Sequence, residues 1–166
     1  MRLLWLFLRA SGESINTIAA CHHSIIGAGQ LTINNERGKM INKGHTDSTC
    51  CVAYSPDGQR LVTGSDDYTA KVWDAKTGTE LLTLKGHTNW VYSIAYSPDG
   101  QRIVTGSDDY TAKVWDAKTG TELLTLKGHT NYVRSVAYSP DGQRLVTGIA
   151  DGKTKVWDAN TGTELE

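Results

Sequence analysis

Residues 86–127 read GHTNWVYSIAYSPDGQRIVTGSDDYTAKVWDAKTGTELLTLK, and this 42-residue stretch decides the fold because the chain repeats it. Residues 44–85 match it at 35 of 42 positions. Residues 128–166 match the first 39 positions of the stretch at 28 places. Self-similarity at a fixed period of this length is typical of proteins built from stacked supersecondary units.

Each 42-residue unit is predicted to form four short strands joined by three tight turns. The segment Ser97-Pro98-Asp99-Gly100 suits a type I turn, with proline second and glycine fourth. Turn residues recur every 8–12 positions, which favours strands over helices. In residues 86–127 the four strands are expected at 91–97, 102–107, 111–117 and 122–127. One such sheet cannot bury both of its faces alone, so neighbouring sheets are expected to stack.

The repeated signature pairs resemble those of the WD40 family. Gly-His-Thr and Trp-Asp each recur three times at steps of 42 residues, from 44–46 and 73–74 onward. The resemblance implies an all-β protein of WD40-type β-propeller blades, three of them clear and four-stranded. The predicted repeats are 44–85, 86–127 and 128–166, and residues 1–43 are either an N-terminal lead-in or a degenerate fourth blade.

The number of blades raises the question of ring closure. Closed propellers have four to eight blades. Three or four blades therefore leave three alternatives: a fragment of a longer propeller, a ring that two chains close together, or a small closed or open monomer.

The resemblance also implies a structural hydrogen-bond tetrad of histidine, serine or threonine, aspartate and tryptophan. Because a buried indole N–H can only donate, it needs an acceptor. In the third unit Ile149 stands where serine is expected, so we expect a broken hydrogen-bond chain and a weaker third blade. The predicted tetrads are His45, Ser65, Asp67 and Trp73, then His87, Ser107, Asp109 and Trp115, then His129, Asp151 and Trp157.

Three kinds of chemical site use residues of the same types. Serine, histidine and aspartate also compose a hydrolase triad, but no G-x-S-x-G turn frames the serine. Cys21-His22-His23 and Cys50-Cys51 lack the spacing of a metal site. The paired aspartates lack the spacing of a calcium loop. The sequence therefore predicts a protein that is not an enzyme and holds no metal or cofactor.

Composition limits the classes of partner and compartment. A net charge of −1 gives no electrostatic case for nucleic acid or an anionic membrane. The apolar run at 3–8 is shorter than a membrane span and poorly suits a signal peptide. Three cysteines, two of them adjacent, favour a reducing compartment over a disulfide scaffold, so a cytoplasmic location is expected.

Positions that differ between near-identical units are the candidates for binding. Six of the seven differences between the first two units fall within 47–52 and its counterpart 89–94. Tryptophan, tyrosine and arginine, which appear there, are enriched in interface hot spots. Neutral drift is the alternative explanation. The predicted docking patch consists of Trp90, Tyr92, Tyr132 and Arg134, with Tyr68 and Tyr110 at its edge and Asp108, at a further variable position, as another partner-binding residue.

Two functions are compatible with these features. The first is an interaction scaffold that presents the patch to a protein or peptide, with a homo-oligomer possible if chains close a ring together. The second is a regulatory or sensor module of a larger kinase or NTPase. A cation–π contact of Arg134 with Trp90 or Tyr132 would fit the first function.

Overall fold

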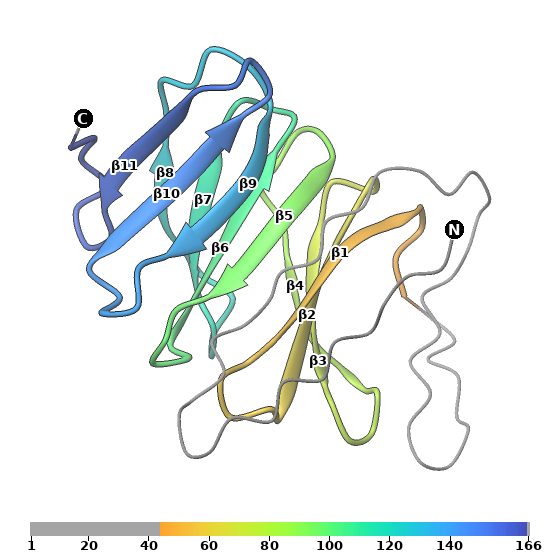
Figure 1. Cartoon of the computed structure of the whole chain (residues 1–166). Coiled ribbons are helices and arrows are strands. Elements are labelled where there is room, and N and C mark those ends of the chain that lie inside the picture. Colours follow the sequence, from red (N-terminus) through yellow and green to blue (C-terminus); the bar gives the residue numbers. More distant parts are fainter. Residues whose placement is uncertain (1–43, 166) are drawn as a thin grey trace, which may run out of the picture.

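The computed structural model describes residues 44–165, which form three antiparallel sheets and confirm the all-β prediction. Each sheet is a meander whose strands pair in chain order (Figure 1). Blade one holds β1 (Thr49–Tyr54), β2 (Arg60–Ser65), β3 (Ala70–Asp74) and β4 (Glu80–Leu84). Blade two holds β5 (Val91–Tyr96), β6 (Arg102–Ser107), β7 (Ala112–Asp116) and β8 (Glu122–Leu126). Blade three holds β9 (Val133–Tyr138), β10 (Arg144–Ile149) and β11 (Thr154–Asp158).

The third blade has three strands within the described residues, where four were predicted. Trp157 pairs with Glu164 in an isolated bridge, as Trp73 and Trp115 pair with the first residues of β4 and β8. Lys155 also forms an ion pair with Glu164 at 2.7 Å, as Lys113 does with Glu122 at 2.9 Å. The chain therefore starts the path of a fourth strand at Glu164.

The predicted turns form as the sequence indicated. The amide of Gly100 donates to the carbonyl of Ser97 at 2.9 Å, and the Ser97 hydroxyl donates to Asp99. Gly100 has φ of +70°, a backbone conformation that glycine adopts without steric cost. Equivalent bonds close the corresponding turns of the other two blades at Gly58 and Gly142.

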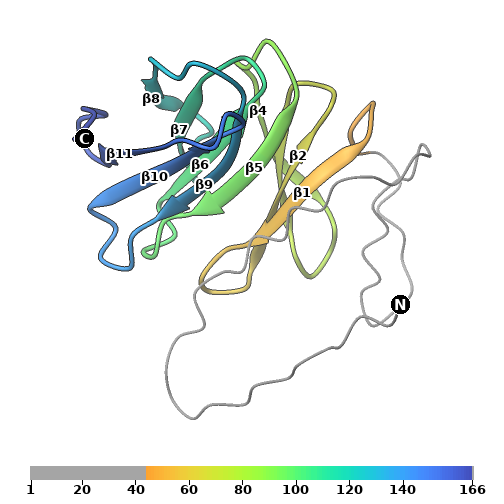
Figure 2. The same cartoon turned by 45° about the horizontal axis from the view of Figure 1, so that its top comes forward.

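The three blades fan out side by side, with β1, β5 and β9 as successive neighbours (Figures 1 and 2). We call the face of a blade toward the preceding blade its leading face, and the opposite face its trailing face. The trailing face of blade one packs Val62 and Val72 against Ile94, Ile103 and Trp115 of blade two. A second core joins the trailing face of blade two to the leading face of blade three.

Glycine permits the close approach of neighbouring blades. A Cβ atom on Gly64 would lie 2.9 Å from the Val91 carbonyl oxygen, and one on Gly106 would lie 3.0 Å from the Val133 carbonyl oxygen. Only a residue without a side chain leaves room for these strands. Residues 44–165 form an arc and no closed ring, and the lead-in or degenerate blade predicted at 1–43 lies outside the described residues.

Candidate functional site

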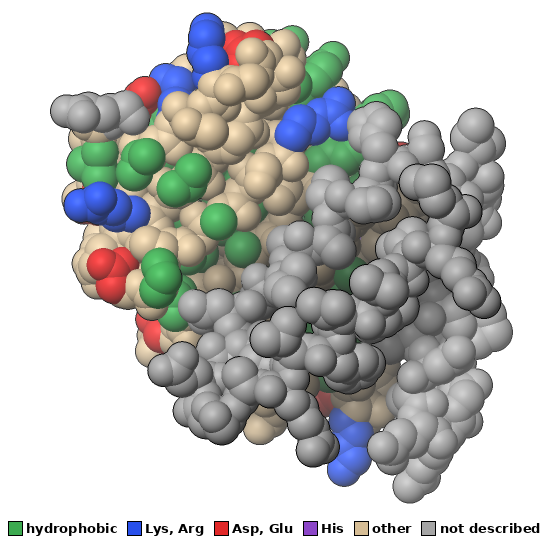
Figure 3. All heavy atoms as spheres, in the orientation of Figure 1, with side chains coloured by type: hydrophobic (Ala, Val, Ile, Leu, Met, Phe, Trp, Pro, Cys, Tyr) green, Lys and Arg blue, Asp and Glu red, His purple; other side chains and the backbone are tan. Residues whose placement is uncertain are grey.

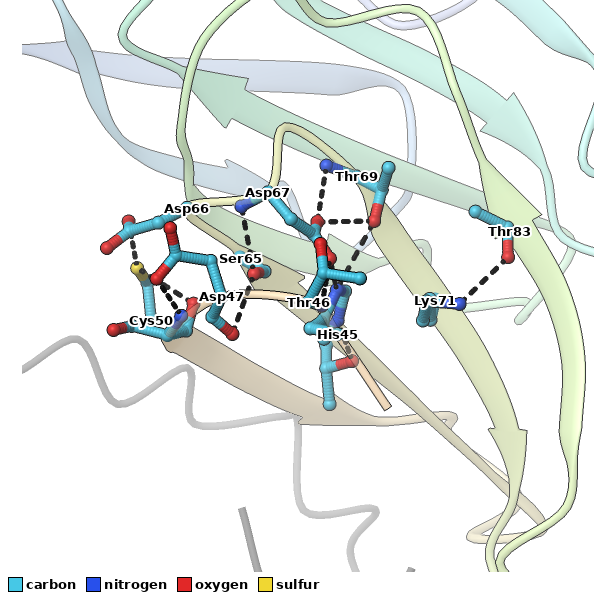
Figure 4. Close-up of polar contacts among 12 residues, drawn as sticks. His45, Thr46, Asp47, Cys50, Ser65, Asp66, Asp67, Thr69, Lys71 and Thr83 are labelled. Carbon is cyan, nitrogen blue, oxygen red and sulfur yellow. Dashed lines mark hydrogen bonds and ion pairs between the residues drawn. The ribbon is translucent and has the colours of Figure 1, made fainter. Parts of the chain in front are cut away.

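A buried hydrogen-bond chain links histidine, threonine and tryptophan in blade one. The Trp73 Nε1–H donates to Thr63 Oγ1 at 2.9 Å, and the same hydroxyl lies 2.7 Å from His45 Nε2. His45 Nδ1 lies 2.9 Å from Asp67 Oδ2 (Figure 4). The hydroxyl thus accepts from the indole and donates to the imidazole, while Nδ1–H donates to the carboxylate. Blade two repeats the chain through His87, Thr105, Asp109 and Trp115.

The prediction that Ser65 and Ser107 supply this hydroxyl is wrong. Ser65 instead accepts the amide of Asp67 at 3.1 Å and donates to the Asp47 carbonyl at 3.3 Å (Figure 4). Strand register explains the error: Trp73 pairs with Leu61, which places it one diagonal step from Thr63 and too far along the strand from Ser65.

One sequence signal pointed to the threonine. Thr63 and Ser65 share a strand face, so alternation alone cannot separate them. The threonine recurs in all three units, as Thr63, Thr105 and Thr147, whereas the serine is replaced by Ile149 in the third unit.

The hydrogen-bond chain of blade three is therefore not broken at Ile149, where the break was predicted. Thr147 accepts from Trp157 Nε1 at 2.9 Å and lies 2.9 Å from His129 Nε2, so the chain continues past Ile149. The difference lies at the carboxylate: His129 Nδ1 contacts the Tyr110 carbonyl at 3.1 Å, while Asp151 accepts from Thr130 at 2.9 Å.

Two replacements explain why Asp151 points away from the histidine. In blade two the Ser107 hydroxyl accepts the Asp109 amide at 3.1 Å, and the Thr111 hydroxyl donates to the carboxylate at 2.6 Å. Ile149 and Lys153 occupy these two positions in blade three, so neither bond is available. The Lys153 ammonium instead lies 3.5 Å from Asp151.

Burial and hydrogen bonding set the ionisation of these groups. Burial acts to raise the pKa of Asp109, but hydrogen bonds from His87 and Thr111 outweigh it and hold that pKa well below its ordinary value. Burial lowers the pKa of both His45 and His129. In His45 the Asp67 carboxylate opposes that shift. Burial thus favours the neutral imidazole of His45 and His129, and hydrogen bonds favour the ionised carboxylate of Asp109.

The predicted docking residues of blades two and three lie together at one end of the sheets. The Arg134 guanidinium lies 4.0 Å from the Tyr92 ring centroid and 5.1 Å from that of Tyr132. The Trp90 ring meets Tyr92 edge-on at 5.8 Å, and Tyr110 lies 5.4 Å from Tyr132. The four rings and the arginine thus form one row of successive contacts, with Arg134 in the middle. The expected contact of Arg134 with Tyr132 is present, and Tyr92 takes the place considered for Trp90.

Asp108, predicted to bind the partner, is instead buried beside Arg134. Its side chain is buried, and Arg134 Nε lies 3.4 Å from its Oδ1. Burial raises the pKa of Asp108, and the arginine opposes that shift. The Asp108 amide also donates to the Trp90 carbonyl at 3.0 Å, which holds the β6–β7 turn beside the start of β5. We call Trp90, Tyr92, Asp108, Tyr110, Tyr132 and Arg134 the aromatic patch.

Tyr68 and Tyr110 adopt a backbone conformation that is unusual for tyrosine. Their φ values are +70° and +69°, in the left-handed region, and both rings are exposed. Gly152 occupies the same place in blade three, with φ of +87°. Tyr110 joins the aromatic patch through Tyr132, whereas no ring contact found among residues 44–165 ties Tyr68 to it.

The described part of the chain holds no group of three or more histidine, cysteine, aspartate or glutamate side chains placed to bind a metal ion. Within the same residues, no helix has the length and apolar character needed to cross a membrane.

Comparison with known proteins finds one family and several partial relatives. The sequence model of the WD domain, G-beta repeat (WD40), matches residues 38–74, 78–116 and 120–158, more than half of the chain. The Periodic tryptophan protein 2 homolog of Mus musculus is 43% identical over 61 residues, 35% of this chain and 7% of that protein. The Ribosome biogenesis protein bop1-B of Xenopus laevis is 51% identical over 39 residues, 24% of this chain and 5% of that protein. The Notchless protein homolog of Arabidopsis thaliana is 48% identical over 40 residues, which are 24% of this chain and 8% of that protein. The chain thus spans less than a tenth of the length of each of these relatives.

Proposed function

The chain belongs to the WD40 family, and from this membership and the geometry above we propose that it is a protein-interaction scaffold whose docking surface is the aromatic patch. WD40 repeats generally serve as such scaffolds and are typically not catalytic. The observation that carries the proposal is the gathering of the patch residues, drawn from two blades, around one guanidinium.

The repeat itself separates scaffold from docking surface. Positions such as Trp115 and Thr105 are identical in all three units, because each blade needs them to satisfy its buried polar groups. The positions of Trp90 and Tyr92 differ in every unit, and in blade two Trp90 is exposed and Tyr92 half-buried. Divergence concentrated at one end of a largely uniform sheet is expected where the blades must fit a partner that is not itself repetitive.

The chemistry of the patch favours a partner segment that combines an apolar side chain with a hydrogen-bond acceptor. Trp90 is 40% exposed, so a large apolar surface remains for contact. The Arg134 guanidinium contacts the Tyr92 and Tyr132 rings and pairs with the Asp108 carboxylate at 3.4 Å, which restricts the direction of its donors before binding. Preorganisation of this kind lowers the entropy that association costs. A backbone carbonyl or carboxylate of the partner would face the guanidinium.

The test is binding of a purified partner to single alanine variants. Partners recovered on the immobilised chain are identified, purified and titrated against Trp90→Ala, Arg134→Ala and the control Leu123→Ala, an exposed leucine on β8. We expect Trp90→Ala and Arg134→Ala each to weaken binding at least about tenfold, equivalent to about 1.4 kcal/mol, and Leu123→Ala to have no effect. Unchanged affinity in both patch variants would falsify the proposal.

Two further expectations remain proposals. We propose a reducing, cytoplasmic setting because the sequence has only three cysteines, two of them adjacent, which does not favour a disulfide scaffold. We also propose that nucleic acid and membrane are not partners, on the near-neutral charge of the chain.

A further inference from the structure

The interface between blades occurs twice in the chain, and its main contacts repeat. Arg60 Nη1 donates to the Ala117 carbonyl at 2.8 Å, and Arg102 Nη1 donates to the Ala159 carbonyl at 2.6 Å. Each contact spans 57 residues, so the second is the first shifted by one repeat. The glycine approach described above, Gly64 to Val91 and Gly106 to Val133, repeats in the same way. Blade-to-blade docking is therefore a property of the repeated sequence.

The trailing face of blade three carries the residues of this interface but has no blade against it within residues 44–165. Val146 is 38% exposed, whereas its counterparts Val62 and Val104 are fully buried. A Cβ atom on Gly148 would meet only Ser135 Cβ, at 3.3 Å. Figure 3 looks onto this side of the molecule, where hydrophobic side chains lie over β9, β10 and β11. Ala137 and Arg144 are exposed on the same blade.

The leading face of blade one is the matching half. Tyr54 is 53% exposed, whereas its counterpart Tyr96 is 4% exposed against blade one. Val52 and Ala75 are half-buried, whereas their counterparts in blades two and three are buried. At each end of the arc, side chains are therefore more exposed than their counterparts at the inner interfaces.

We propose that a second copy of this chain docks head to tail, with its blade one leading face on the blade three trailing face. By equivalence with the inner interfaces, Arg144 donates to the Ala75 carbonyl of the second copy, and Thr49 of that copy lies over Gly148. The Ser135 hydroxyl accepts the Val52 amide, as the Ser93 hydroxyl accepts the Val136 amide at 3.1 Å. The occupant is a second copy because the complementary residues are those of this sequence. Self-association of this kind is independent of the aromatic patch, which lies at the end of the sheets.

Light scattering on the full chain with the variant Gly148→Ala tests this interface. We expect the wild-type mass to exceed the 18.1 kDa monomer and to rise with concentration. The added methyl group fits inside the chain with a small shift of Ser135, but it meets the backbone of a docked strand. Gly148→Ala should therefore raise the dissociation constant at least about tenfold and leave the melting temperature of the monomer unchanged.

The internal counterpart supplies the matched control. Gly106→Ala places its Cβ 3.0 Å from the Val133 carbonyl within one chain, so it should lower the melting temperature of the monomer itself. A second association variant, Val146→Asp, puts a charge on the exposed face and should also give monomers. A wild-type chain that stays at 18.1 kDa at its highest soluble concentration overturns the proposal. The proposal is also overturned if the chain associates but neither Gly148→Ala nor Val146→Asp weakens the association.

Discussion

At the residue scale, one threonine per blade satisfies two buried groups at once. Thr105 accepts from the Trp115 indole at 2.9 Å and lies 2.7 Å from His87 Nε2. The threonine, the histidine and the tryptophan are all buried, so water cannot replace the hydroxyl. A buried donor left unpaired costs about 1–3 kcal/mol. The threonine is therefore the residue on which the tetrad depends.

Replacing Thr105 with valine should lower the free energy of unfolding by about 2 kcal/mol. Valine has nearly the same shape, so the loss reports the missing hydroxyl and no cavity. Urea unfolding followed by tryptophan fluorescence measures it. The exposed Thr88, changed to valine, is the control and should lose less than about 0.5 kcal/mol. Equal stability of Thr105→Val and Thr88→Val would contradict the assigned role.

Acid should destabilise the fold through its histidines. The pKa values of His45 and His129 are lowered below 6.5 in the folded chain, so the unfolded chain binds more protons as the pH falls through 6.5. Stability is then fully present above that pH and declines below it. His129→Gln should lose less stability than wild type between about pH 7.5 and about pH 5.5 in urea titrations. A decline of the same size in both proteins would contradict this assignment.

At the element scale, the turn between β10 and β11 differs from its two counterparts. In blades one and two the turn aspartate bonds the histidine, and a serine and a threonine hold it there. In blade three the aspartate bonds Thr130 outside the tetrad. The turn still closes, because Gly152 donates its amide to the Ile149 carbonyl at 3.0 Å.

Restoring the two side chains should restore the bond. In the double variant Ile149→Ser and Lys153→Thr, Asp151 regains an acceptor for its amide and a donor for its carboxylate. We expect the carboxylate to turn to His129, which should raise the pKa of His129 as followed by NMR titration. Adding Asp151→Asn to the double variant should return the pKa of His129 to its wild-type value. A double variant with an unchanged His129 pKa would show that other residues hold the turn.

At the scale of the whole molecule, the blades are unequal although their sequences are nearly the same. Blade two is covered on both faces, so Val104 and Val114 are fully buried. Blade three has three strands and one uncovered face within the described residues. Repeat stability is roughly a sum of unit terms and neighbour terms, so position in the array decides stability.

Amide hydrogen exchange should be slower in a blade that is covered on both faces than in a blade that is covered on one. Amides of β5–β7 should exchange most slowly and those of β9–β11 fastest, because local opening follows burial. Mass spectrometry of exchanged peptides measures this at a concentration where light scattering reports monomers. Equal protection in β5–β7 and β9–β11 would mean that sequence and not position sets blade stability.

The sequence alone determined the blades and identified every residue of the aromatic patch, with Tyr68 in excess, and the tertiary structure decided which atoms meet. The 42-residue period, the turn residues and the strand alternation act locally, so β2, β6 and β10 form where the pattern places them. Divergence between units identified Trp90 and Arg134. The choice of Thr63 over Ser65 depended on strand register, which alternation leaves open. The contact of Arg134 with Tyr92 and with the buried Asp108 joins residues of two blades. It depended on how closely those blades pack, which the sequence of one repeat does not determine.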